Sequence, residues 1–356
     1  MRHPGGNFFH IRYLLEHLLP ALRSEGFVVA VLVDEYTEQD LKDVLGDVIL
    51  FRLKYLNPLA TDLLVFFYSC VFSPTVFLRA NGQLPWISLP CLEVMGVADL
   101  NFRWLPMSRV KKVYKEVSYG MSLLRADSVV CVSSFTLHDV ETKLSVLRSK
   151  LVLLHHGSPI LPPPIKVLAP FSQFFITFGH QAHKNVEEIL HALSRLNAMG
   201  HLLCLVVIGR SDHVETKLKP LVAELGLGKS VWFCGRVSDA ELAWLYRESR
   251  GLVFMSRFEG FGLPLLEAMV CNCPFIYARA TSLMEVAGSA GVGVELGDLS
   301  DLQSEMLKLW NDPEHRQRLA ELGRRRSSEF SWKDTANRMT ELLSGLNDSA
   351  LGGGLV

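Results

Sequence analysis

Short apolar segments of strand length alternate with amphipathic segments of helix length along most of this chain. The alternation is clearest in the second half, where the expected strands are 174–178, 202–208, 231–235, 251–255, 274–277 and 291–294. Strands that alternate with helices in this way form a parallel sheet with helices on both faces. Ligands of such sheets bind beyond the carboxyl ends of the strands, so the residues that follow each strand are the candidates for function.

The first half repeats the alternation less regularly. Its apolar periodicity predicts a helix over residues 8–22, and strands at 27–33, 63–67, 86–89, 128–132 and 151–154. Because 356 residues exceed what one core usually holds, the chain is expected to form two α/β domains.

The proline-rich segment 159–164 is the best candidate for a linker, because consecutive prolines make a stiff, extended connection. We therefore expect a first domain at 1–160 and a second domain at 161–330. Residues 331–347 are expected to form a helix that packs back toward the first domain, and 348–356 to be a disordered tail.

Composition narrows the class of protein. With 49% hydrophobic and 21% charged residues the chain is globular, and its net charge of −1 argues against nucleic acid as a partner. The seven cysteines lie mostly in apolar runs, which favours reduced thiols in a cytoplasmic protein. No signal peptide is visible, and the longest apolar run, 63–78, is shorter than the roughly 20 residues that span a bilayer. The sequence leaves open whether the protein makes peripheral contact with the inner face of a membrane.

One motif in the second half carries the strongest chemical signal. The segment 256–269 contains a glycine-rich turn, and Pro264 suits the first position of a helix, where its missing N–H is no loss. We expect the N–H groups of Gly262, Leu263, Leu265 and Leu266 to point out of this helix end. Such an end favours an anion such as a phosphate.

Two acids flank this turn, Glu259 and Glu267. A phosphate would repel both carboxylates unless they bind hydroxyl groups beside it. A nucleotide sugar offers a diphosphate for the helix end, and sugar and ribose hydroxyls for the two carboxylates. It would therefore match all the polar groups of the segment. The alternative for each acid alone is that Glu267 complements the helix dipole and Glu259 is a solvated loop residue.

Four motifs in this order resemble glycosyltransferase family 4: Gly179 with Lys184-Asn185, then 235–242, 259–269 and 285–288. The resemblance implies the GT-B fold, in which two Rossmann-like doubly wound domains face a central cleft. It implies retaining transfer from a nucleotide-diphosphate sugar such as a UDP- or GDP-sugar, with no metal and no other cofactor. The acceptor would be a glycan, a lipid-linked glycan or a small molecule.

The resemblance also implies roles for residues. Lys184 and Glu259 would be catalytic, the first as a cation for the diphosphate and the second near the donor sugar. Glu267 would accept hydrogen bonds from the ribose, and residues 235–237 would border the base. The implied donor-binding residues are Gly179, His180, His183, Lys184, Gly235, Arg236, Val237, Gly260, Phe261, Gly262, Leu263 and Glu267. The diphosphate oxygen would act as the base in a front-face attack.

Two departures from the family concern the acceptor side. The family begins with a strand before its first glycine-rich turn, whereas this chain opens at Met1 and reaches Gly5 and Gly6 without one. Many members carry His-Asp after the strand that corresponds to 86–89. Here the corresponding pair is Cys91-Leu92, and Glu93 is the candidate substitute.

A third departure lies in the donor loop, where the arginine that accompanies the lysine is missing. His180 or His183 is the candidate replacement, in which case transfer would strengthen as the imidazole becomes protonated near pH 6–7. The alternative is that both are solvated loop histidines. His155 and His156 at the end of strand 151–154 either line the cleft or make local hydrogen bonds.

Other functions and partners stay open. Arg103, Arg109, Lys111, Lys112 and Lys115 either meet anionic lipid head groups or form a solvated helix face. The same fold also serves phosphorylases and epimerases, and a further alternative is a binding or scaffold protein that lost catalysis. The sequence does not determine the oligomeric state.

Overall fold

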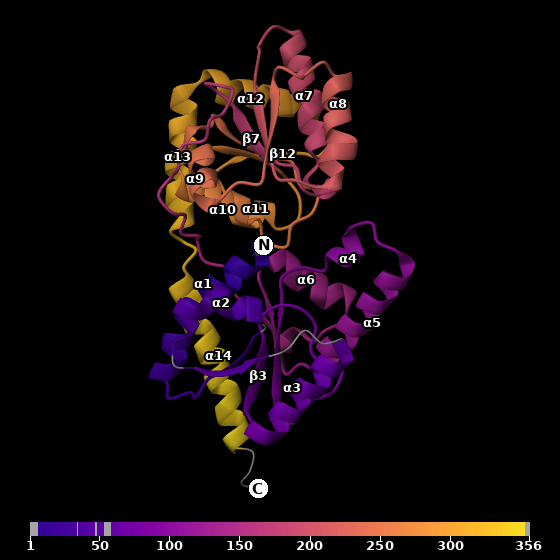
Figure 1. The fold of residues 1–356 in the computed structure, drawn as a ribbon, viewed down its shortest axis with the longest axis vertical. Coiled ribbons are helices and arrows are strands. Elements are labelled where there is room, and N and C mark those ends of the chain that lie inside the picture. The colour runs from indigo at the N-terminus through magenta and orange to yellow at the C-terminus, as the bar shows by residue number, and fades with distance from the viewer. Residues whose placement is uncertain (1–5, 34, 47, 53–57, 353–356) are drawn as a thin grey trace. The chain divides into compact units, whose positions relative to one another are not determined.

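The computed structural model describes residues 6–33, 35–46, 48–52 and 58–352. The chain divides into two compact units (Figure 1). Unit 1 comprises residues 1–157 and 331–356, and unit 2 comprises residues 158–330. The division at Gly157 lies three residues before the boundary expected from the prolines.

Unit 2 contains one parallel sheet of six strands in the order β12-β11-β10-β7-β8-β9. Its strands are β7 (Phe175–Phe178), β8 (Leu205–Ile208), β9 (Val231–Gly235), β10 (Gly251–Phe254), β11 (Phe275–Ala278) and β12 (Val292–Val294). All the strands predicted for this half are present. From β7 the chain first adds strands on one side and then returns to add β10 on the other, so the order reverses between β7 and β10.

Helices connect these strands. They are α7 (Val186–Ala198), α8 (Lys219–Glu224), α9 (Asp239–Glu248), α10 (Leu263–Val270), α11 (Leu283–Ala287), α12 (Leu299–Asn311) and α13 (Pro313–Ser327), with short turns η2 (Ala182–Lys184) and η3 (Val214–Leu218). The capping box that the sequence predicts at Ser238 and Glu241 is confirmed, since both reciprocal hydrogen bonds are made at the start of α9.

Unit 1 contains two parallel sheets. One has the order β3-β4-β5-β6, and the other pairs β1 with β2. The strands are β1 (Ala30–Val33), β2 (Ile49–Arg52), β3 (Val76–Arg79), β4 (Leu92–Val97), β5 (Ser128–Cys131) and β6 (Leu151–Leu153). The helices are α1 (Gly6–Ser24), α2 (Glu35–Leu45), α3 (Pro58–Phe72), α4 (Asn101–Trp104), α5 (Arg109–Arg125), α6 (Ser134–Lys143) and α14 (Trp332–Gly352), with the turn η1 (Arg148–Lys150).

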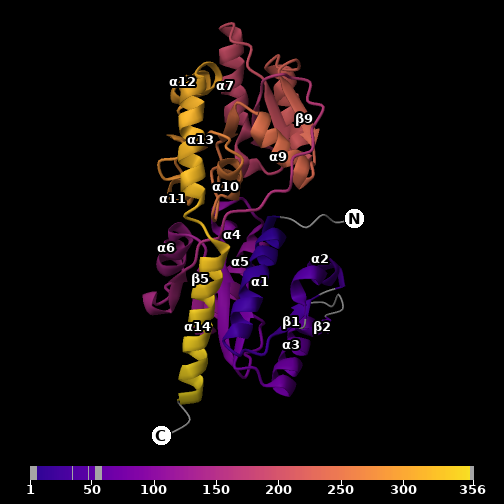
Figure 2. The same cartoon turned by 90° about the vertical axis from the view of Figure 1, so that its left-hand side faces the viewer.

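Side chains alternate between the two faces of the four-stranded sheet, as the period of a strand requires. Val94 and Val130 pack on the face that α1 and α14 cover. Met95 and Val129 pack on the opposite face, where α5 and α6 lie. Figures 1 and 2 show α1 beside α14 in both views, while α3, α5 and α6 lie on the other side of the strands in Figure 1.

The last helix, α14, belongs to unit 1 although it follows unit 2 in the chain. Its residues Ala336, Met339 and Leu343 share a core cluster with Leu18 and Leu22 of α1. The helix continues to Gly352, five residues into the segment expected to be disordered. Residues 353–356 lie outside the described part of the chain.

Two expectations for the first half are wrong. Residues 63–67 lie inside helix α3, and residues 86–89 lie in a loop before β4. A continuous apolar run has no period that separates a buried strand from a helix, and α3 is such a run. Strands β2 and β3 were not foreseen.

Two predictions from composition concern cysteine and membrane spans. All seven cysteines are free thiols in the structure. Within the described ranges, none of the helices combines the length and the apolarity that crossing a bilayer requires.

The assignment of Cys91 and Glu93 to the acceptor side requires correction. Both lie at the amino end of β4, whereas ligands of a parallel sheet bind at the carboxyl ends. Glu93 is buried, and its carboxylate receives hydrogen bonds from Arg125 at 2.9 Å and from the Leu89 N–H at 3.4 Å. Its role is therefore structural. Gly5 lies outside the described residues, and Gly6 begins α1.

Replacing Glu93 with Ala is expected to lower the stability of unit 1 by about 3 kcal/mol, because it leaves the Arg125 guanidinium without its buried partner. Thermal or urea unfolding measures this loss. A residue of the acceptor site would behave in the opposite way, with normal stability and impaired binding.

Candidate functional site

The reversal of strand order between β7 and β10 brings two predicted residues together. Lys184 follows β7 and Glu259 follows β10, and these neighbouring strands end at the same edge of the sheet. The Lys184 Nζ donates a hydrogen bond to the Glu259 Oε1 at 2.6 Å. Both side chains are mostly buried, with 7% and 13% of their surface exposed. A buried ion pair thus lies at the point where doubly wound sheets bind ligands.

The backbone around Lys184 is fixed from the β10 side. Asn185 adopts the left-handed conformation (φ 55°, ψ 43°), which Asn tolerates better than most residues. The Arg257 Nη2 donates to the Asn185 Oδ1 at 2.7 Å, and the Arg257 N–H donates to the His183 carbonyl at 2.8 Å. The Lys184 ammonium also lies 4.9 Å from the centre of the Phe254 ring. These contacts hold the lysine in one position.

The loop that carries Glu259 is fixed by the start of α11. The Ser282 hydroxyl lies 2.9 Å from the carbonyl oxygens of Glu259 and Phe261, and it can donate a hydrogen bond to either of them. The Glu259 N–H donates to the Thr281 Oγ1 at 3.1 Å. The glycine-rich turn is therefore preorganised by side chains about 20 residues further along the chain.

The turn ends at Gly262, whose φ of 110° favours glycine. A Cβ at this position would lie 2.7 Å from the Leu283 Cδ2, so a larger residue would clash with α11. Pro264 is the second residue of α10, one position later than expected. A second detail differs from the prediction: the Leu265 N–H already donates to the Gly262 carbonyl at 3.0 Å, so it does not point outward.

Glu267 lies one turn into α10 and is half-buried. The Tyr246 hydroxyl donates a hydrogen bond to the Glu267 Oε2 at 2.8 Å. Desolvation raises the pKa of Glu267 to about 7, while the hydrogen bond from Tyr246 and the nearby Lys184 charge act in the opposite direction. Glu267 therefore changes its protonation close to neutral pH, which suits a group that exchanges hydrogen bonds with a ligand.

The two donor-loop histidines have pKa values opposite to the hypothesis drawn from the sequence. Desolvation and the adjacent Lys184 charge lower the pKa of His180 and of His183 to about 4. We therefore expect both imidazoles to be neutral between pH 6 and 8, contrary to the hypothesis of protonation near pH 6–7. No group of three or more His, Cys, Asp or Glu placed to hold a metal ion occurs among the residues that the structure describes.

The remaining donor-side residues lie at the ends of β7, β8 and β9. A Cβ on Gly179 would lie 2.5 Å from the Val207 Cγ1, so only glycine fits there. The Gly209 N–H donates to the Gly235 carbonyl at 2.7 Å, and this pair closes the edge between β8 and β9. Arg236 is exposed, and Val237 is half-buried.

Sequence reasoning missed the residues that hold these groups in place, namely Tyr246, Arg257, Thr281 and Ser282. Tyr246 had a usable signal, because a tyrosine at an apolar helix position needs a partner for its hydroxyl. Arg257, Thr281 and Ser282 had none, since their contacts depend on loops brought together by the sheet.

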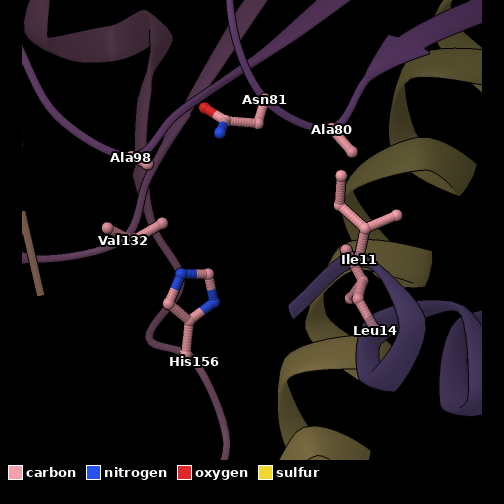
Figure 3. Close-up of a pocket in the computed structure, with 7 residues that line it drawn as sticks. All are labelled: Ile11, Leu14, Ala80, Asn81, Ala98, Val132 and His156. Atoms are coloured by element: carbon pink, nitrogen blue, oxygen red, sulfur yellow. The ribbon is translucent and has the colours of Figure 1, made fainter. Parts of the chain in front are cut away.

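Unit 1 has a pocket at the carboxyl edge of its own four-stranded sheet (Figure 3). Ala80 and Asn81 follow β3, Ala98 follows β4 and Val132 follows β5. His156 follows β6, and its imidazole faces the same space as the Asn81 amide, while Ile11 and Leu14 of α1 close the opposite side. Cys91 and Glu93, the acceptor-side residues expected from the sequence, are not part of this pocket. They were expected to follow a strand at 86–89, whereas they lie at the start of β4.

A family model supports the assignment of unit 2. The model for glycosyl transferases group 1 matches residues 172–326. Residues 172–326 belong to that family. The ion pair, the glycine turn and Glu267 all lie within this glycosyltransferase domain.

Curated relatives extend the match beyond the domain. The chain is 27% identical over 241 residues to O-antigen chain mannosyltransferase B of Escherichia coli, covering 64% of this chain and 63% of that protein. It is 35% identical over 246 residues to the MMP alpha-(1->4)-mannosyltransferase of Mycolicibacterium hassiacum, covering 66% of this chain and 58% of that protein. The matches thus span about three fifths of each relative's length.

Solved structures show the fold of the whole chain. The sucrose-phosphate synthase of Thermosynechococcus elongatus superposes with a TM-score of 0.77 at 20% identity, covering 97% of this chain and 94% of that one. Anabaena HepE, solved with UDP and glucose, gives a TM-score of 0.73 at 15% identity and covers 97% of both chains. The predicted GT-B fold is therefore confirmed.

The raised pKa of Glu267 predicts a pH-dependent stability. Below pH 4.5, the ordinary pKa of this group, the carboxyl is protonated in both the folded and the unfolded chain. As the pH rises toward 7, the unfolded chain releases the proton while the folded chain keeps it, so the folded state loses stability. The loss reaches up to about 3 kcal/mol and is complete above the folded pKa.

Replacing Glu267 with Gln removes this loss and keeps an acceptor for Tyr246. Chemical denaturation of both proteins at pH 5 and pH 8 measures the effect, and the variant is expected to gain stability relative to the wild type at pH 8. Parallel behaviour of the two proteins at both pH values would show that the Glu267 pKa is not raised.

Proposed function

We propose that this chain transfers a sugar from a nucleotide-diphosphate donor to a glycan, lipid-linked or small-molecule acceptor, with retention of configuration and without metal. The observation that carries the proposal is the Lys184–Glu259 ion pair at 2.6 Å, located after the carboxyl ends of β7 and β10 and just before α10 in the chain. A cation and a helix end suit a diphosphate, and a carboxylate suits a sugar.

In this proposal unit 2 binds the donor through three groups. Lys184 and the backbone of residues 260–263 bind the diphosphate. Glu267 accepts hydrogen bonds from the ribose hydroxyls, and the segment 235–237 borders the base through its backbone. The buried position of Tyr246 supports the role of Glu267, because a carboxylate already held by one hydroxyl has a second oxygen for the ligand.

The reaction breaks the bond between the anomeric carbon and the diphosphate oxygen, and forms a bond from that carbon to the acceptor hydroxyl oxygen on the same face. The acceptor proton passes to the departing diphosphate. Lys184 stabilises the negative charge that develops on the leaving group. Donor binding draws Lys184 toward the diphosphate and releases Glu259, whose carboxylate then faces the positive charge at the anomeric carbon.

The names of the relatives support a narrower proposal for the sugar. Two of them are mannosyltransferases, and one makes an O-antigen chain. We therefore propose mannose as the transferred sugar, with UDP or GDP as the nucleotide. The unit 1 pocket, with the Asn81 amide and the His156 imidazole among apolar groups, is the proposed acceptor site. The proposal places the enzyme in the cytoplasm, in peripheral contact with a membrane.

The central test is stabilisation by nucleotides. UDP or GDP is expected to raise the melting temperature, since a ligand at 100 times its dissociation constant adds about 2.7 kcal/mol to the folded state. The matching sugar donor is then expected to release the diphosphate. No shift at millimolar concentration would refute the donor site, and binding without any release would indicate a binding protein instead of an enzyme.

The two acids are expected to differ when replaced. Replacing Glu267 with Ala removes a charged acceptor and weakens nucleotide binding by about 10- to 100-fold. Replacing Glu259 with Gln frees Lys184 from its ion pair, so nucleotide affinity is unchanged or higher while turnover falls. Equal losses of affinity in both variants would refute this division of roles.

The donor-loop histidines are expected to contribute no pH dependence between pH 6 and 8, because their pKa values are lowered to about 4. At saturating donor, the ratio of wild-type activity to that of the double variant His180→Gln and His183→Gln is therefore constant over this range. A ratio that rises toward pH 6 would restore the hypothesis of a protonated histidine.

A further inference from the structure

Helix α5 exposes a row of large apolar side chains. Val110, Val113, Val117, Met121 and Leu124 recur at helical spacing on one side, and between 40% and 81% of each residue's surface is exposed. The row extends over most of the helix. Single exposed apolar residues are ordinary on protein surfaces, but a continuous row on one helix face marks an interaction site.

The opposite face of α5, which packs on the core of unit 1, is more polar than usual. Its buried residues are Ser118, Tyr119, Ser122 and Leu123. The Ser118 hydroxyl donates to the Gln83 Oε1 at 2.7 Å, and the Leu84 N–H donates to the Ser122 Oγ at 3.1 Å. A helix on a soluble domain normally has apolar residues inward and polar residues outward. In α5 this arrangement is largely inverted, so its sequence suits an apolar neighbour on the outside.

Helix α3 extends the same surface. Leu63, Phe67 and Val71 lie four residues apart on its outer side, each between 52% and 59% exposed. Trp86 connects the two helices, because its backbone N–H donates to the Asp62 Oδ2 of α3 at 2.9 Å and its ring centre lies 6.0 Å from that of Tyr114 of α5. In Figure 1 both helices lie on the right-hand side of unit 1. We call the eight exposed residues of α3 and α5 the apolar face.

The charges on α5 are mostly basic, although Arg125 is paired with the buried Glu93 and α3 carries the acid Asp62. Helix α5 contains five basic residues and one acid, a net charge of +4 in a chain whose total is −1. The acid, Glu116, is paired with Arg103. Arg109, Lys111 and Lys112 are exposed in the first turn, adjacent to the start of the apolar row. An outward apolar row next to clustered basic residues is the pattern of a helix that lies in the surface of an anionic membrane.

We propose that the apolar face of α3 and α5 docks unit 1 on the surface of an anionic lipid bilayer. The side chains of the apolar face enter the boundary between head groups and acyl chains, and the basic residues of α5 contact the lipid phosphates. A second copy of this chain fits less well, because a symmetric contact through α5 would bring two like-charged helices together. The inference does not depend on glycosyl transfer.

The test is sedimentation of the full chain with vesicles of phosphatidylcholine that contain phosphatidylglycerol, and with vesicles of phosphatidylcholine alone. The wild type is expected to bind the anionic vesicles, to bind the neutral ones much more weakly, and to lose affinity as salt is raised. Replacing Lys111 and Lys112 with Gln is expected to reduce the partition coefficient about fivefold per charge.

A neutral variant tests the apolar contribution. Replacing Val113, Val117 and Leu124 with Ser removes apolar surface without changing charge, and is expected to lower partition at least tenfold, an order of magnitude set by the lost apolar area. The matched control replaces Ile165, Leu168 and Met199 of unit 2, which are also exposed, with Ser and is expected to bind normally. Both variants should keep the wild-type melting temperature and nucleotide response.

Three results would overturn the proposal. The first is the absence of binding to anionic vesicles. The second is equal binding by the α5 serine variant and its control. The third is a wild type that does not bind vesicles but forms a dimer in sedimentation velocity, or a complex with another protein. In that case the α5 serine substitutions would disrupt the dimer or the complex.

Discussion

The ion pair between Lys184 and Glu259 is the contact on which the arrangement of the donor side depends. A buried ammonium without a partner is costly, so its pairing with Glu259 holds the Glu259 loop against the end of β7. Arg257, Thr281 and Ser282 then fix the two loops around the pair. The two loops are consequently packed around one ion pair, and under the proposed function a diphosphate would replace Glu259 as the anionic partner of Lys184.

Much of this could be read from the sequence because unit 2 follows local rules closely. Each strand is a short apolar run bounded by glycine or polar residues, and the capping box at Ser238 marks the start of α9. The glycine at 262 and the proline at 264 locate the turn before α10. What the sequence could not supply was the protonation of the site, since the pKa shifts of His180, His183 and Glu267 arise mainly from desolvation where the loops pack together.

In unit 1 the same reasoning misplaced two strands, and the cause is physical. Residues 63–67 are apolar on all sides, and that pattern is shared by a buried strand and by a helix whose outer side is apolar. Residues 86–89, expected to form a strand, lie in a loop before β4, so Cys91 and Glu93 lie at the amino end of a strand and do not follow one. The first of these errors concerns a helix that also belongs to the apolar face, because α3 does not turn polar residues toward water.

The return of α14 to unit 1 imposes an order on folding during synthesis. The core of unit 1 is incomplete without Ala336, Met339 and Leu343, which are translated after the whole of unit 2. At about 5–20 residues per second, the ribosome needs on the order of 10–40 s to pass from the end of β6 to this helix. Unit 2 is thus the first part of the chain able to complete its core, and the nascent unit 1 must keep the sheet face meant for α14 from aggregating until that helix emerges.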